Sequence, residues 1–88
     1  MIVKFLNSFS RDLNQIQNLR IKSLIIKMIS TIEISNHLNE ISGIKKLKRH
    51  KSAYRIRIGD YRIGLFYEKN HVELARIVHR KDIYNLFP

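Results

Sequence analysis

The sequence contains no cysteine and little glycine or proline, with three Gly and a single Pro at the last position. The missing cysteine excludes disulfides, thiolate metal sites and cysteine nucleophiles. The scarcity of Gly and Pro argues against long disordered stretches. No apolar run approaches the roughly 18 residues of a membrane span, and the start, Met-Ile-Val-Lys-Phe, is too short and too polar for a signal peptide. We expect a cytoplasmic protein.

Acidic residues are also scarce: seven Asp and Glu stand against 17 Lys and Arg, giving a net charge of +10 over 88 residues. The excess is local, because residues 45–62 hold eight Lys and Arg and one acid, Asp60. A concentrated basic surface attracts polyanions, of which nucleic acid is the commonest in a cell. A chain of this length predicts one domain, residues 1–88, with a thin core.

Motifs for metal or nucleotide chemistry are missing. The sequence has no His-Glu-x-x-His, no Walker loop and no convincing cluster of carboxylates. Its four histidines are scattered at positions 37, 50, 71 and 79. The sequence therefore predicts neither a metal site nor a small-molecule cofactor.

Hydrophobic periodicity predicts two helices and four strands. Ser8 is the expected N-cap of a helix over 8–17, and a stronger apolar stripe predicts a second helix over 19–36. Strands are expected at 1–5, 54–58, 61–67 and 72–78, and the tail 79–88 has no clear period.

The order β-α-α-β-β-β defines an α+β fold. Strands joined by tight turns must be antiparallel, and amphipathic helices need a sheet face on which to bury their stripes. We therefore predict two N-terminal helices packed on one face of a four-stranded antiparallel sheet.

Gly59-Asp60 forms a two-residue hairpin loop. This loop places Arg57 opposite Arg62 and Arg55 opposite Gly64. Because side chains alternate along a strand, the three arginines share one face. The opposite face should carry Tyr54, Ile56, Ile58, Tyr61, Ile63 and Leu65.

Two arginines directly opposite each other on a sheet repel, and folding does not require that arrangement. An anion in front of the face would relieve the repulsion, and the small Gly64 would leave room for a ligand backbone. The alternative is an ordinary solvated face, since exposed charge is the common state of arginine. Three arginines beside a Lys-rich loop favour the anion site.

The segment Tyr-Arg-Ile-Arg-Ile-Gly-Asp-Tyr-Arg-Ile-Gly at 54–64, preceded by Lys-Leu-Lys and followed by His-Arg-Lys-Asp-Ile-Tyr at 79–84, resembles the RelE/ParE superfamily of toxins from type II toxin–antitoxin modules. The resemblance covers essentially the whole chain. It implies the RelE-like fold and an antitoxin protein as partner. It does not separate the RelE branch, which cleaves mRNA on the ribosome, from the ParE branch, which inhibits DNA gyrase.

Carried over to the RelE branch, the resemblance implies a catalytic set and a set of cations that contact RNA. The implied catalytic residues are Arg55, Arg57, Arg62, His79, Arg80 and Tyr84. The basic loop before the hairpin supplies the expected RNA-binding residues Lys45, Lys46, Lys48, Arg49 and Lys51.

The chain departs from some RelE proteins, which have lysines where it has Arg55 and Arg57. An arginine does not deprotonate in practice, so neither residue can be the general base, although both can clamp phosphate. The base would be Tyr84, His79 or a ribosomal group.

Three functions from different classes follow. The first is a ribosome-dependent mRNA endonuclease that uses the 2′-OH of its own substrate and needs no metal. The second is a gyrase inhibitor without catalysis, and the third is an inactive relative that binds nucleic acid or only its antitoxin. Retention of Arg62, Arg80 and Tyr84 favours the first, whereas arginine at 55 and 57 slightly favours the third.

Overall fold

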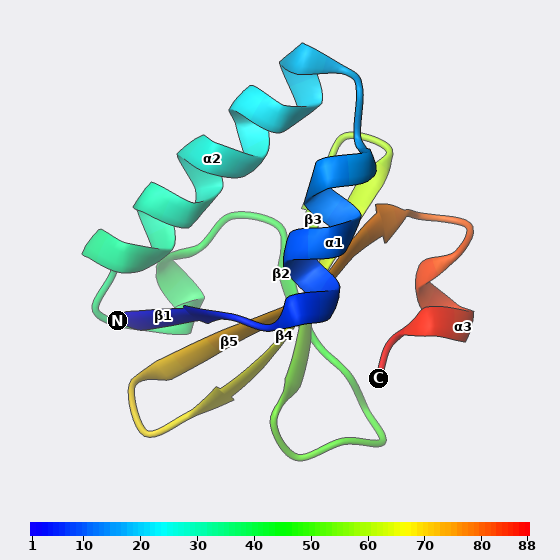
Figure 1. The fold of residues 1–88 in the computed structure, drawn as a ribbon. Coiled ribbons are helices and arrows are strands. Elements are labelled where there is room, and N and C mark those ends of the chain that lie inside the picture. Colours follow the sequence, from blue (N-terminus) through cyan, green and yellow to red (C-terminus); the bar gives the residue numbers. More distant parts are fainter.

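The computed structural model describes all 88 residues and shows an α+β fold (Figure 1). None of its helices has the length and hydropathy needed to cross a membrane. In chain order the elements are β1 (Ile2–Phe5), α1 (Asn7–Gln15), α2 (Leu19–Ile34), a 3₁₀ turn (Leu38–Glu40), β2 (Ile44–Lys46), β3 (Ala53–Ile58), β4 (Tyr61–Glu68), β5 (His71–His79) and α3 (Ile83–Leu86).

The sheet has five strands in the order β1-β5-β4-β3-β2 and is mixed. The predicted four-stranded antiparallel sheet is wrong in two details. β2 lies where the sequence predicts no strand, because three residues are too few to show a period. β1 runs parallel to β5, and no tight turn joins these two strands, so the antiparallel rule does not apply to them.

The two long helices cover one face of the sheet, as predicted (Figure 1). Phe9 from α1 and Ile25 and Ile32 from α2 are fully buried against the sheet residues Ile56 and Ile63. The Asn18 side chain accepts a hydrogen bond from the backbone N–H of Ile21 at 3.1 Å, which caps α2. The helices end at Gln15 and Ile34, two residues before their predicted ends.

A second, smaller core lies on the opposite face of the sheet. Its buried members are Ala53, Ala75, Ile83 and Phe87. Ile83 and Phe87 belong to the tail, where the sequence shows no period, and the helix α3 that carries Ile83 is only four residues long. The C-terminal segment therefore covers part of the face that carries the arginines.

An irregularity in β5 lies beneath α1. Leu65 pairs with Leu74, while Gly64 pairs with Arg76, so Ala75 is one residue too many for its partner strand. The Ser8 hydroxyl donates a 2.6 Å hydrogen bond to the carbonyl of Ala75. The prediction of Ser8 as an N-cap is wrong: α1 begins at Asn7 and has no side-chain cap.

Asp12 on α1 covers the edge of β5 beyond the end of β1. Its carboxylate accepts a hydrogen bond from the backbone N–H of Ile77 at 3.1 Å and two from the Arg76 guanidinium at 2.7 and 3.0 Å. The Asp12 side chain is only 10% exposed. This carboxylate thus joins α1 to a strand that would otherwise carry an unpaired backbone donor.

We predict that Asp12→Ala lowers the free energy of unfolding by about 2 kcal/mol, because it leaves a partly buried N–H without an acceptor. Urea denaturation measures this loss. Asp12→Asn keeps an acceptor and should lose less. The control is Asn14→Ala, which changes an exposed side chain on the same helix. Equal stabilities for Asp12→Ala and Asn14→Ala would contradict this role.

Candidate nucleic-acid interface

The β3–β4 hairpin sets the positions of the arginines. Gly59 has a positive φ of 55°, which suits a tight turn. Across the hairpin Arg57 pairs with Arg62 and Arg55 with Gly64, as the sequence predicts. The intervening residues point to the other face, where Ile56, Ile58, Ile63 and Leu65 are buried in the main core.

The neighbouring strand β2 adds to this basic face. Lys45 pairs with Arg55, so both side chains lie on the same side of the sheet. An open hollow of about 350 Å³ lies here, lined by Gly43, Lys45, Arg55, Arg57, Arg62 and Tyr84. We call these lining residues, together with Arg80, the basic face. Its cationic groups come from three strands and the C-terminal segment, and they lie close enough together to act on a single anion.

Arg62 is the most constrained cation of the basic face. Its guanidinium donates hydrogen bonds to the carbonyls of Gly59 and Tyr61 at 3.0 and 2.9 Å. Partial burial lowers its pKa from the ordinary value, and the charges of Arg57, Arg80 and Arg55 lower it further. The lowered pKa thus reflects burial first, and then repulsion among like charges that lie close together.

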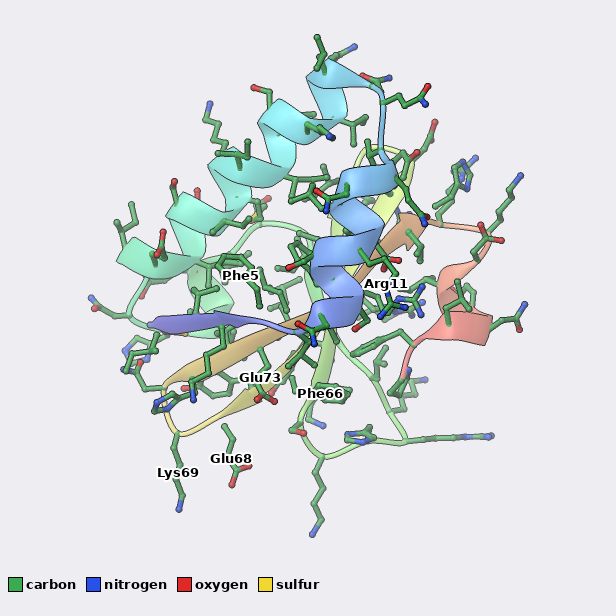
Figure 2. All side chains as sticks on the ribbon, in the orientation of Figure 1. Phe5, Arg11, Phe66, Glu68, Lys69 and Glu73 are labelled. Carbon is green, nitrogen blue, oxygen red and sulfur yellow. The ribbon has the colours of Figure 1, made fainter.

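No carboxylate neutralises this repulsion. The one ion pair of the structure joins Arg76 to Asp12. Glu68 lies at the far end of β4 from Arg62, beside the β4–β5 turn (Figure 2). The basic face is thus an uncompensated cluster, and an anion would stabilise it.

The C-terminal segment adds two predicted residues to the face. The backbone N–H of Arg80 donates to the carbonyl of Asp60 at 2.8 Å, which places Arg80 beside the hairpin turn. Tyr84 lies with its ring centroid 4.6 Å from the guanidinium carbon of Arg55. Hydrogen bonding from Arg55 and its positive charge lower the pKa of Tyr84, and the charges of Lys45 and Arg62 act in the same direction.

His79 is the predicted catalytic residue that does not reach the basic face. It pairs with Tyr61 across β4 and β5, and the two rings lie 5.8 Å apart. Tyr61 packs against the core beneath the helices, so His79 lies on the helix-covered side. The expectation that the tail brings His79 to the edge of the arginine face is therefore wrong.

Gly64 does not leave room for a ligand, because the Phe87 ring fills the space above it. A Cβ on Gly64 would lie 2.5 Å from Cγ of Phe87. Phe87 also contacts Phe66, with ring centroids 5.1 Å apart. Sequence analysis missed this packing, although a glycine within an aromatic and β-branched strand marks a close approach.

The basic loop divides into two groups of cations. Lys48, Arg49 and Lys51 are exposed. The Lys46 ammonium instead donates to the carbonyl of His50 at 2.7 Å and lies over the ring of its partner Tyr54, so it faces the opposite side of the sheet from Lys45.

A second hollow separates this loop from the C-terminal segment. It is lined by Leu47, Lys48, Arg49, His50, Arg55, Tyr84, Phe87 and Pro88. Arg55 and Tyr84 form the wall that the two hollows share. Sequence analysis did not single out His50 or Phe87, since a lone His in a Lys-rich loop and a Phe near a terminus carry no distinctive signal.

No protein-family model matches the chain. The chain is 38% identical to Toxin RelE3 of Methanocaldococcus jannaschii, over the full length of both proteins. It resembles the toxin fold in a RelB–RelE antitoxin–toxin complex from Methanococcus jannaschii, with a TM-score of 0.82, 36% identity and coverage of 97% of this chain and 99% of the other. A YoeB dimer from Staphylococcus aureus shares the fold at a TM-score of 0.72 and 19% identity, covering 91% and 97% of the two chains.

We predict that Arg55→Gln raises the pKa of Tyr84 toward its ordinary value. The guanidinium stabilises the phenolate, so its removal makes the hydroxyl harder to ionise. NMR titration of the tyrosine Cζ resonances, assigned with Tyr84→Phe, measures the change. Arg57→Gln is the matched control, because it removes a charge from the same hollow without touching the Tyr84 ring. A pKa that is the same in the parent and in Arg55→Gln would disprove the contact.

Proposed function

The chain belongs to the RelE family of toxins of type II toxin–antitoxin systems, and from that premise we propose that it is a ribosome-dependent mRNA endonuclease. The observation that supports this proposal is the basic face: Arg55, Arg57 and Arg62 line one hollow with Tyr84, the charge of Arg80 acts on Arg62 nearby, and none of these arginines has a carboxylate partner. A single phosphate group of RNA has the charge that this cluster lacks.

The proposed reaction is transesterification within the RNA. The 2′-oxygen forms a bond to the adjacent phosphorus, and the bond from phosphorus to the 5′-oxygen of the next nucleotide breaks. Negative charge builds on the phosphate oxygens in the transition state. Arg62 and Arg80 would stabilise that charge, and positively charged groups aimed at developing charge give a large share of catalysis.

We assign the acceptance of the 2′-OH proton to the Tyr84 phenolate, and the leaving 5′-oxygen takes up a proton from water to give the 5′-hydroxyl. Arginine stays protonated, so Arg55 and Arg57 act as phosphate clamps and not as bases. Tyr84 is more acidic than an ordinary tyrosine because of Arg55, and a base works best when its pKa approaches the working pH. His79 is left out of this step, since it lies on the helix-covered side of the sheet.

Ribosome binding is the proposed role of the remaining cations. Lys45, Lys48, Arg49 and Lys51 are exposed and project from β2 and the following loop. They would contact the backbone of ribosomal RNA while the ribosome holds the mRNA in line for attack. Lys46 would contribute less, because its ammonium is already bound within the loop.

An antitoxin is the proposed protein partner. The relative from Methanococcus jannaschii is described in complex with RelB, and several other similar structures are toxin–antitoxin complexes. The antitoxin of this chain would cover the basic face with a segment that is acidic or carries apolar anchors. An antitoxin bound there would block access of RNA phosphate to the basic face. The free toxin would act in the cytoplasm, where the ribosome is.

We predict that Arg62→Ala and Arg80→Ala lower single-turnover cleavage on programmed ribosomes by about a hundredfold, or roughly 3 kcal/mol, because each removes stabilisation of the transition state. Their affinity for the ribosome should change little. Lys48→Ala should show the reverse pattern, with a modest loss of affinity, a flatter salt dependence and a nearly normal rate at saturation.

Wild-type rates in both arginine variants would contradict the assignment. A parent protein that leaves ribosome-bound mRNA intact and inhibits gyrase would replace the nuclease with the gyrase inhibitor.

We also predict that capture of the antitoxin is fast at low salt and slows as salt rises, since long-range attraction to the net +10 chain steers an acidic partner. Stopped-flow measurement of the association rate of the purified pair tests this. The NaCl concentration is varied from about 50 to about 500 mM, a range over which the Debye length shortens severalfold. The Lys48→Ala/Lys51→Ala double variant should lessen the salt dependence. Association rates that do not respond to salt would argue against this route of capture.

A further inference from the structure

Phe87 makes a close contact with the sheet that the proposed chemistry does not use. Phe87 is 5% exposed, and its ring lies directly above Gly64 in β4. A Cβ on Gly64 would be 2.5, 2.6 and 2.8 Å from three carbons of the ring. Carbon atoms in favourable contact are about 3.5–4.0 Å apart, so a methyl group at position 64 and the Phe87 ring cannot occupy their present places together.

The glycine at position 64 is explained by this contact alone. Gly43 and Gly59 have positive φ values of 80° and 55°, but Gly64 does not have a positive φ. A glycine inside a strand weakens the strand, because it is flexible when unfolded and has no side chain to pack. Backbone conformation therefore does not require Gly64, whereas the approach of the Phe87 ring does.

Tyr84 depends on its neighbours in the C-terminal segment for its position. Tyr84 is 75% exposed and contacts the sheet through Arg55, whose guanidinium carbon lies 4.6 Å from the centroid of the Tyr84 ring. Ile83, beside it, is 1% exposed, and the backbone N–H of Phe87 donates to the carbonyl of Ile83 at 2.9 Å. Phe87 follows α3 in an extended conformation and lines the same hollow as Tyr84, so these two side chains lie near each other.

We propose that Phe87 is a positioning residue: its ring, seated over Gly64, fixes the C-terminal segment against the sheet and thereby holds Tyr84 over Arg55. The placement of Tyr84 stands on these contacts alone. The effect on RNA cleavage rests on the proposed function, in which Tyr84 takes the proton of the 2′-OH.

The experiment uses two substitutions that break the same contact from opposite sides. Phe87→Ala removes the ring, and Gly64→Ala removes the space that the ring needs. Each variant is compared with Leu86→Ala, which changes a 43% exposed residue of the same short helix. Circular dichroism and urea denaturation report whether the main core, which contains neither Phe87 nor Gly64, remains folded.

The first measurement is the pKa of Tyr84 in the free toxin, by NMR of the tyrosine Cζ resonances. The charged groups that lower the Tyr84 pKa are Arg55, Lys45 and Arg62, and the cations Arg57, Lys48 and Arg49 line the hollows that Tyr84 also lines. All six remain in every variant. We expect Phe87→Ala and Gly64→Ala to raise the Tyr84 pKa to the value found in Arg55→Gln, because the Tyr84 ring moves away from the Arg55 guanidinium. Leu86→Ala should keep the parent pKa of Tyr84. Phe87→Leu, which keeps an apolar side chain over Gly64, should give a Tyr84 pKa between those of the parent and Phe87→Ala.

The second measurement is single-turnover cleavage on programmed ribosomes. Phe87→Ala and Gly64→Ala should lower the rate at saturating toxin by on the order of tenfold, since misplacing a catalytic group by about 1 Å can cost up to a hundredfold. The toxin concentration at half-maximal rate should stay within about twofold of the parent, because the loop cations are unchanged. A variant that is merely less stable would not show this split.

The double variant Gly64→Ala/Phe87→Ala closes a thermodynamic cycle. Once the ring is gone, the added methyl group has nothing to displace, so the double variant should be at least as stable as Phe87→Ala and should match it in Tyr84 pKa. A parent pKa in both single variants would overturn the proposal, as would a full additive loss in the double variant. If the pKa moves as expected but the parent protein does not cleave mRNA, the positioning role stands and the proposed function fails.

Discussion

The feature on which the structure depends is the forced approach of Arg57 and Arg62 across the β3–β4 hairpin. A two-residue turn leaves the strands no other register, and the core residues Ile56 and Ile63 fix which face the arginines take. Like charges opposite each other on a sheet destabilise it. The fold tolerates that cost without a neutralising carboxylate, so the hairpin keeps an uncompensated positive charge that would attract an anion.

The two faces of the sheet are completed by different parts of the chain. The N-terminal helices bury one face, and α1 is fastened to the edge of β5 through Asp12. The C-terminal segment covers only part of the other face, with Phe87 over Gly64 and Tyr84 over Arg55. That partial cover leaves the basic hollow open and places Tyr84, whose pKa is lowered by the Arg55 guanidinium, at the hollow's wall.

The sequence was sufficient for features that depend on local rules. The Gly59-Asp60 turn fixed the register of the hairpin, and strand alternation then placed the arginines. The parallel pairing of β1 with β5 and the packing of Phe87 on Gly64 join residues far apart in the chain, where no period links them. The extra residue Ala75 had a weak signal: Val72, Leu74 and Ile77 are all core residues, which strict alternation forbids.

The chemical ends of the cleaved mRNA test most directly whether the basic face carries out phosphate chemistry within RNA. Cleavage by attack of the 2′-OH leaves a 2′,3′-cyclic phosphate on one fragment and a 5′-hydroxyl on the other. We predict these ends from programmed ribosomes incubated with the parent toxin, and their loss in Arg62→Ala. Fragments with a 3′-hydroxyl and a 5′-phosphate, or intact mRNA, would contradict the account.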